Sequence, residues 1–325
     1  MLTDEIESTS SAPLVSVSIT SYNAERWLSR AIDSVLAQRT SFPLEIVISD
    51  DCSKDGTRNI AASYQERFPN KIRFIARQKN LGMQRNTFET FEACRGEFIA
   101  WLDADDYWTD PDKLTLQVDA LQSDPSINVC GHFVRWVTAD GEVKRDRYPS
   151  AAAGRYGLAD ILHRNFLPAP SVMFRNGIHR DLPPWYFTIE ALSDWPLHIL
   201  SALSGDILLL DRVMADYMLT PDSAFMSKGS LYWYQADAKF FHLVESMLPQ
   251  RFKRIARSEK GRRYESAAYL LRKQGGFEAS RRAAWSAFRA PRLQDNLGSK
   301  TKALAASVIR EAQWRLRGSP KPNPQ

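Results

Sequence analysis

The sequence has little of what marks secreted, membrane-spanning or disulfide-stapled proteins. Its 325 residues include only three cysteines, Cys52, Cys94 and Cys130, which are scattered and lack metal-ligand spacing. No apolar run approaches the roughly 20 residues that a membrane-spanning helix needs. The first 13 residues are acidic and polar, unlike a signal peptide. We therefore expect a cytoplasmic chain, in a reducing compartment, without a disulfide framework.

Charge, by contrast, is abundant and unevenly distributed. The net charge is +5, but residues 225–325 contain 21 Lys and Arg against 7 Asp and Glu, a balance of +14. Residues 1–224 therefore carry 22 basic against 31 acidic side chains, a balance of −9. An acidic body followed by a basic segment predicts two functional parts, the second of which faces an anionic partner.

Strand-like and helix-like segments alternate along the first part of the chain. The pattern predicts strands at 14–20, 44–50, 71–76, 96–103, 127–137 and 169–175, with one or two more in 206–219. It predicts helices at 24–38, 55–68, 83–94, 110–125, 156–165 and 192–205. This order is typical of an α/β fold with a mostly parallel sheet covered on both faces. We expect a disordered leader in 1–13, an α/β domain in 14–225 and a basic α-helical region in 226–325.

Polar side chains follow the predicted strands, where α/β sheets bind ligands. The apolar run "FIAWL" ends in Asp103, Asp105 and Asp106. Carboxylate oxygens suit Mg²⁺ or Mn²⁺, which would offset the cost of burying like charges together. The alternative is an acidic turn that caps the next helix.

Other candidates have similar alternatives. Asp51 ends the second strand and could accept bonds from a nucleotide, or it could cap the helix that follows. Asp194, in "SDWPLHI", is a candidate general base, or it is simply an N-cap. His132 and His198 are lone histidines among apolar residues, for which we expect core roles. The single glycine of "NLGMQRN" (80–86) predicts a turn into a helix.

Together these segments resemble the motifs of family 2 glycosyltransferases. The segments are "VSVSITSYNAERWLSRAIDSVLAQ", "LEIVISDDCSKDGT", "NLGMQRN", "GEFIAWLDADDYWTDPDKL" and "LSDWPLHI", in order over roughly residues 14–220. The resemblance implies a GT-A fold, a nucleotide-sugar donor with UDP expected, a divalent metal, and inversion at the anomeric carbon. It also implies a glycan or lipid-linked acceptor, because similar bacterial members build surface polysaccharides.

The resemblance assigns roles to individual residues. It implies that the nucleotide sugar contacts Thr20, Tyr22, Asn23, Asp51, Asn80 and Asp103. It implies that Asp103 and Asp105 hold the metal, with Asp105 the stronger candidate and Asp106 an uncertain third. Asp194 falls at the catalytic base of the family, although Ser193 replaces the usual Glu.

One segment departs from the family. Many members have a Tyr-Arg-x-His-like segment whose His helps bind metal or diphosphate. Here Met218 stands in the place of the Arg and Thr220 in the place of the His. The hydroxyl of Thr220 is a poor substitute for imidazole. The metal site is then weaker or is completed by another group, and a catalytically impaired protein that acts through its basic tail is the alternative function.

The basic region and the acidic motif each leave a rival open. An anionic membrane surface fits the +14 region, with 302–317 at the interface and Trp314 as an anchor. Apolar positions such as Tyr264, Ala268 and Trp285, with Leu271 and Phe288, suggest packing between helices. Nucleic acid is the less favoured partner, because no recognition motif accompanies the charge. A D-x-D-x-[T/V] phosphatase is disfavoured because Tyr107 holds the Thr/Val place.

Overall fold

The structure, a computed structural model, describes residues 12–188, 194–220 and 229–290. The strands are β1 (Val15–Ser21), β2 (Leu44–Asp50), β3 (Ile72–Ala76), β4 (Phe98–Asp103), β5 (Tyr107–Trp108), β6 (Ile127–Thr138), β7 (Val143–Tyr148), β8 (Gly154–Tyr156), β9 (Met173–Arg175) and β10 (Asp206–Leu219). The α-helices are α1 (Leu28–Leu36), α2 (Thr57–Arg67), α3 (Met83–Ala93), α4 (Lys113–Ser123), α5 (Leu158–His163), α6 (Trp195–Ser204), α7 (Ser230–Val244), α8 (Gln250–Lys273) and α9 (Phe277–Arg289). Short 3₁₀ turns cover Ala169–Ser171, Ile178–Asp181, Pro184–Thr188 and Glu245–Met247.

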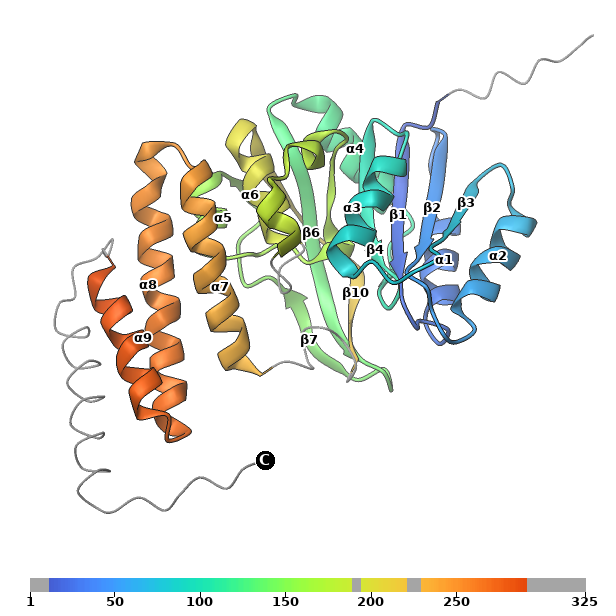
Figure 1. Ribbon diagram of the computed structural model, residues 1–325. Coiled ribbons are helices and arrows are strands. Elements are labelled where there is room, and N and C mark those ends of the chain that lie inside the picture. Colours follow the sequence, from blue (N-terminus) through green and yellow to red (C-terminus); the bar gives the residue numbers. More distant parts are fainter. Residues whose placement is uncertain (1–11, 189–193, 221–228, 291–325) are drawn as a thin grey trace, which may run out of the picture. The chain divides into compact units, whose positions relative to one another are not determined.

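The described strands form one mixed sheet (Figure 1). Its order is β3-β2-β1-β4-β9-β6-β10-β5, with β7 paired to β6 and β8 paired to β10. Strands β1 to β4 are mutually parallel, whereas β9 runs antiparallel to both β4 and β6. Strands β6 and β10 are again parallel. The antiparallel β9 thus joins two parallel groups.

Strand β1 lies at the centre of the parallel group and is buried on both faces. Val15, Val17 and Ile19 have no exposed surface, as expected for a strand covered on both sides. The intervening Ser16 is equally buried, and its hydroxyl donates to Glu45 Oε1 at 2.7 Å and accepts from Gly96 N at 2.8 Å. The parallel group is therefore the rigid part of the sheet.

The carboxyl ends of β1, β2 and β4 lie at one edge of the sheet. In the register of the strands, Thr20 is paired with Asp103, and Ser21 with Asp50. The polar clusters that follow these strands in the sequence are therefore neighbours in space, as predicted.

The predicted elements of the first part are confirmed, apart from short pieces. Residues 206–219 form the single strand β10, and 169–175 divides into a 3₁₀ turn and β9. The sequence did not predict β5, β7 or β8. Two of these are strands of two or three residues, and β7 is exposed along most of its length, so none carries the hydrophobic pattern of a buried strand.

The chain divides into two compact units. The first contains residues 1–158, 165–187 and 193–220, and the second contains 159–164, 188–192 and 221–325. In the described part of the second unit, α7 and α9 each pack on α8. No helix in the described ranges is sufficiently long and apolar to cross a bilayer.

Packing within the helical unit agrees in part with the sequence. Ala268 is buried, as predicted, whereas Trp285 is 48% exposed and packs against its neighbours less completely than its spacing suggested. The Phe288 side chain, segment 302–317 with Trp314, and most of the predicted leader lie outside the described residues.

Candidate active site

Asp103 ends β4 with its carboxylate held by two donors. The Thr20 hydroxyl donates to Asp103 Oδ1 at 3.0 Å, and the indole Nε1 of Trp101 donates to the same oxygen at 3.1 Å. Burial raises the pKa of Asp103 above its usual value, and the negative charge of Asp194 raises it further against these two bonds. The two donors fix the carboxylate of Asp103. The effect of the Asp194 charge on its pKa indicates that the two carboxylates are near one another.

Asp105 and Asp106 follow Asp103 in a tight turn, and both are poorly solvated. Burial, and then the charge of Asp103, raises the pKa of Asp105 to about 6. Burial and the charges of Asp105 and Asp103 raise the pKa of Asp106 well above its usual value, although the backbone N–H of Met218 donates to its Oδ1 at 2.7 Å. The first turn of α4 is bonded by the Gln38 side chain, whose Oε1 accepts from Leu114 N at 3.1 Å, so the alternative that Asp103, Asp105 and Asp106 cap this helix is wrong.

Asp194 comes from a distant part of the sequence, at the N-terminus of α6. Its Oδ1 accepts from Trp195 N at 2.7 Å, and its Oδ2 accepts from the Asn165 amide at 2.8 Å. Burial raises the pKa of Asp194, while the Asn165 bond opposes that increase. The N-cap alternative is therefore confirmed, but the cap also leaves a desolvated carboxylate whose charge reaches Asp103.

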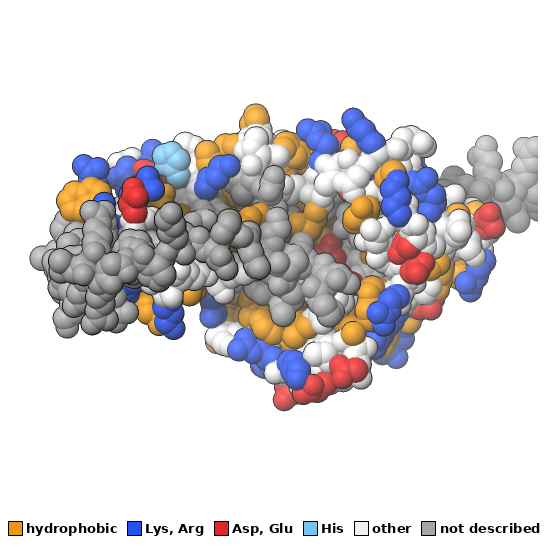
Figure 2. Space-filling view, turned by 60° about the horizontal axis from the view of Figure 1, so that its bottom comes forward, with side chains coloured by type: hydrophobic (Ala, Val, Ile, Leu, Met, Phe, Trp, Pro, Cys, Tyr) orange, Lys and Arg blue, Asp and Glu red, His pale blue; other side chains and the backbone are white. Residues whose placement is uncertain are grey.

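Tyr217 of β10 links the two groups of acids. Burial raises the pKa of its phenol well above the usual value, and the charges of Asp106, Asp105, Asp103 and Asp194 raise it further, in that order. All four carboxylates therefore lie near enough to this tyrosine for their charges to act on its phenol. Figure 2 shows the face that holds the carboxyl edge of the sheet, where acidic side chains are visible at depth near the centre. The structure brings the predicted metal ligands and the predicted base into one site.

Asp51 positions the loop before α3. Its carboxylate accepts from Leu81 N at 2.7 Å and from Gly82 N at 2.9 Å, and the Asn80 amide donates to its backbone oxygen at 3.1 Å. Asp51 does not cap α2, where the carboxylate of Asp55 instead accepts from the first turn. The capping alternative for Asp51 is thus wrong, and Asp51 and Asn80 join two of the predicted nucleotide-binding loops.

Tyr22 and Asn23 lie just beyond the end of β1. The Tyr22 side chain is 51% exposed, which leaves its ring available to a ligand. Asn23 has a φ of 49°, and its side-chain oxygen accepts from Lys54 N at 2.9 Å, while its own N–H donates to Ser53 Oγ at 2.9 Å. Asn23 therefore shapes the loop after β2, and its predicted contact with a nucleotide stays a prediction.

The acids fit a divalent cation by charge and by donor type. The charge of Asp103 raises the pKa of Asp105, and the charges of both raise the pKa of Asp106. None of the three forms an ion pair with a described Lys or Arg. Carboxylate oxygens are the ligands that Mg²⁺ and Mn²⁺ prefer. Within the described residues, no three acidic, Cys or His side chains converge as a preformed metal cage. Such sites commonly use one or two carboxylates and complete the shell with phosphate oxygens and water.

The segment that departs from the family pattern lies next to these acids. The backbone of Met218 bonds Asp106, and Thr220 is 7% exposed two residues further on. The sequence left open what replaces the missing histidine. His132 and His198 have core positions instead, as predicted: His132 contacts the Phe133 carbonyl at 2.8 Å, and His198 contacts the Leu167 carbonyl at 3.3 Å.

Three features of the site were not predicted from the sequence. Asn165 was not among the predicted site residues, and the fold brings it to Asp194. Asp216 accepts from Arg135 at 2.6 and 2.7 Å and from the Tyr107 hydroxyl, which neutralises one acid beside the cluster.

The third is a row of aromatic rings that leads away from the acids. The Trp136 ring lies 6.2 Å from Tyr217 and 4.7 Å from Tyr148 between centroids. The guanidinium of Arg145 lies 5.0 Å from the Trp136 ring centre. We call Tyr217, Trp136 and Tyr148 the aromatic row. No sequence periodicity marks it, because its members come from three strands.

The chain is similar in sequence to known glycosyltransferases. The profile of the family described as Glycosyl transferase family 2 matches residues 16–182. The uncharacterized protein Rv1520 of Mycobacterium tuberculosis is 40% identical over 199 residues, which cover 61% of this chain and 56% of that protein. The putative teichuronic acid biosynthesis glycosyltransferase TuaG of Bacillus subtilis is 39% identical over 110 residues, or 34% of this chain and 42% of TuaG. The matched segments thus span about half the length of these relatives, 56% of Rv1520 and 42% of TuaG.

Solved structures share its fold. Residues 1–349 of S. aureus TarS, in complex with UDP-GlcNAc, align with a TM-score of 0.65 at 18% identity and cover 95% of this chain and 93% of that one. The mannosyltransferase PcManGT of Pyrobaculum calidifontis, in complex with GDP-Man and Mn²⁺, aligns with a TM-score of 0.56 at 16% identity and covers 94% and 88%. The expected GT-A fold, followed by helices, is confirmed. On the match to its family profile, the chain belongs to glycosyl transferase family 2.

Proposed function

We propose that the protein is an inverting glycosyltransferase that moves a sugar from a nucleotide-sugar donor to a hydroxyl of a glycan or lipid-linked acceptor. The observation that carries the proposal is the convergence of Asp194 with Asp103, Asp105 and Asp106 around Tyr217. Asp194, which is distant in the sequence, acts as the base. The three acids after β4 bind the metal that stabilises the charged leaving group. The names of the polysaccharide-related relatives support the same reaction class.

Asp194 is suited to take a proton. Its raised pKa makes it a stronger base than a solvated aspartate, and its two hydrogen bonds hold both oxygens in place. In the proposed step, the acceptor hydroxyl gives its proton to Asp194 and its oxygen forms a bond to the anomeric carbon. The bond from that carbon to the diphosphate oxygen breaks, and its electron pair leaves on the diphosphate. This single displacement inverts the anomeric centre.

The acids at the end of β4 would hold the cofactor. Asp105, with Asp103, would bind Mg²⁺ or Mn²⁺, and the bound metal would neutralise the developing charge of the nucleoside diphosphate. Thr20 and Trp101 orient Asp103 for this role through their two hydrogen bonds. Tyr22, Asn23, Asp51 and Asn80 would form the nucleotide side of the site. UDP is the expected nucleotide, supported by neighbours solved with UDP or UDP-GlcNAc, although GDP-Man occurs in another.

We place the acceptor beside the aromatic row. Tyr217 lies among the acids, so the row offers apolar ring faces that begin at the point of reaction. For a lipid-linked acceptor, the protein would be cytoplasmic and peripheral on the inner face of the cell membrane. The +14 charge of residues 225–325 supports attraction to that anionic surface.

Turnover of a panel of nucleotide sugars with Mn²⁺, repeated with EDTA, tests the proposal. Release of the nucleoside diphosphate that depends on the metal and on an added glycan acceptor supports it. Binding of anionic lipid or RNA by a protein that turns over no nucleotide sugar would instead favour the catalytically impaired alternative.

A further inference from the structure

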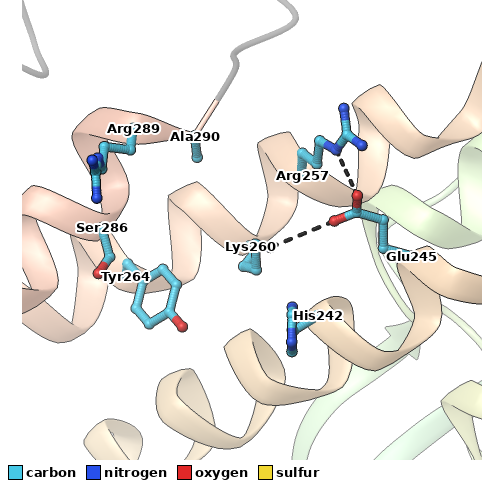
Figure 3. A pocket seen from close by; sticks show the side chains of 8 residues that line it. All are labelled: His242, Glu245, Arg257, Lys260, Tyr264, Ser286, Arg289 and Ala290. Carbon is cyan, nitrogen blue, oxygen red and sulfur yellow. Dashed lines mark hydrogen bonds and ion pairs between the residues drawn. The ribbon is translucent and has the colours of Figure 1, made fainter.

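The helical unit contains a pocket that the proposed reaction does not use. It has a volume of about 490 Å³ and is lined from α7, α8 and α9. Figure 3 shows His242 of α7, Lys260 and Tyr264 of α8 and Arg289 of α9 around this opening, with Glu245 and Arg257 at one side. The volume is within the range of small-molecule sites in proteins.

The pocket is built by a close approach of two helices. Gly261 of α8 faces Ala290 at the end of α9, and a Cβ atom at Gly261 would lie 2.5 Å from the Ala290 Cβ. Glycine therefore lets the end of α9, which carries Arg289, come against α8, which carries Lys260. This contact makes the pocket a property of the helix packing rather than a gap between loose side chains.

The side chains that line the pocket carry more positive than negative charge. Glu245 forms ion pairs with Arg257 at 2.6 Å and with Lys260 at 3.5 Å, so one carboxylate serves two cations. Burial alone would raise the pKa of Glu245, but the Arg257 bond and the Lys260 charge bring it below its usual value. Among the described residues, no carboxylate lies within ion-pair distance of Arg289.

A purely structural ion-pair network does not account for this arrangement. Structural networks in the same unit balance their charge more closely: Arg263, for example, bridges Glu259 and Asp237. Around the pocket, three cations face one carboxylate, and the Tyr264 hydroxyl and the His242 ring add hydrogen-bonding groups. Such a set is complementary to an oxyanion with several acceptor oxygens.

We propose that this pocket binds a phosphate group, either as the headgroup of an anionic lipid or as a free phosphate ester. Lys260 and Arg289 provide the charge that Glu245 leaves uncompensated, and Tyr264 donates to a phosphate oxygen. The proposal is separate from the transfer reaction, because none of these residues belongs to the acid site. It makes recognition in the basic region specific to a phosphate, beyond general attraction to a charged surface.

The test compares Arg289→Gln and Lys260→Gln with a matched control, Arg282→Gln. Arg282 also lies on α9, is 75% exposed and pairs with Glu278, so the control removes the same charge away from the pocket. Inorganic phosphate should raise the melting temperature of the wild-type protein at constant ionic strength. Each pocket variant should weaken phosphate affinity about tenfold or more, as expected for charge-assisted bonds, and the control should leave it unchanged.

Vesicle flotation separates the two sources. If the phosphate belongs to a lipid, vesicles of phosphatidylcholine with phosphatidic acid should bind the wild-type protein but not the Arg289→Gln variant. Phosphate binding that needs Arg289, with vesicle binding that does not, assigns a soluble phosphate ester. Equal responses of Arg282→Gln and Arg289→Gln, no response to phosphate, or Arg289-dependent binding of single-stranded RNA alone would overturn the proposal. Stabilisation by UDP and Mn²⁺ should persist in every pocket variant. Failure of the phosphate proposal is therefore distinguishable from failure of the transferase assignment.

Discussion

Asn165 donates a hydrogen bond of 2.8 Å to Asp194 Oδ2, and this amide orients the second carboxylate oxygen of the proposed base. The other oxygen is occupied by the backbone of Trp195. Because the Asn165 bond favours the charged carboxylate, it lowers the pKa of Asp194 against the effect of burial. The same bond therefore sets both the orientation and the working pH of the base.

Replacing Asn165 by Ala should shift the acidic limb of the kcat–pH profile to higher pH. The variant loses a bond that lowers the pKa of Asp194, so protonation of the base begins at a higher pH. The matched control is Asn176→Ala, which removes a half-buried amide bonded to Gly96 O and leaves Asp194 untouched. A limb that moves equally in both variants, or in neither, would show that Asn165 does not tune the base.

Replacing Asp105 by Asn should stabilise the metal-free protein at neutral pH by about 1–3 kcal/mol. The pKa of Asp105 is raised to about 6 in the folded state, so its contribution to stability is lost as the pH rises through that value. The melting temperature in EDTA should decline less in the variant than in the wild type between about pH 4 and 7, the range that spans the unfolded and folded pKa values.

The same variant should lose most of the stabilisation that Mn²⁺ gives the wild type. Asp119→Asn, an exposed change on α4, is the control and should behave as wild type in both measurements. Full stabilisation of Asp105→Asn by Mn²⁺ would contradict the metal assignment.

Replacing Gly82 by Ala should weaken UDP binding measured by calorimetry. Gly82 has φ 83° and ψ 153°, a conformation that residues with a Cβ rarely adopt, and the strain costs about 1–3 kcal/mol. The change would disturb the loop whose N–H groups bond Asp51. Gly141→Ala, at φ 88° in the turn between β6 and β7, also places a Cβ at a positive φ, outside the nucleotide loops. Equal UDP affinity in the two variants would argue against a nucleotide-binding role for the Asp51 loop.

Replacing Thr220 by His should tighten Mn²⁺ binding. The resemblance to the family predicts a histidine at the position of Thr220, two residues after Met218, whose N–H bonds Asp106. An imidazole here would add a nitrogen ligand close to the acids. Calorimetric titration of Mn²⁺ into the two proteins measures the change, with the melting temperature as a check on packing at this buried position. Unchanged affinity in a well-folded variant would mean that another group already completes the site.

The sequence could predict the parallel part of the fold because local patterns determine it. The runs 14–20, 44–50 and 96–103 are buried on both faces, and such strands show as continuous apolar segments with polar residues after them. Asp51, Asp103 and Asp105 follow those strands directly, so strand pairing alone places them at one edge.

The remainder depends on long-range contacts that leave no local pattern. Strand β5 has two residues and pairs with β10, about a hundred residues away, and Asn165 meets Asp194 only after both strand groups are in place. For Trp285 the helical spacing indicated packing but not its extent, and the side chain is 48% exposed. The pocket around Lys260 likewise needs Gly261 and Ala290 to meet, which no spacing along one helix predicts.

The central claim is that Asp194 is the base of a sugar transfer supported by the acids after β4. Its most direct test is nucleoside diphosphate release with a nucleotide-sugar panel, Mn²⁺ and glycan acceptors, comparing wild type with Asp194→Asn. Loss of a positioned general base costs about 10²- to 10⁴-fold, so kcat should fall by at least about a hundredfold while donor binding persists. Turnover at the wild-type rate in Asp194→Asn would contradict the account.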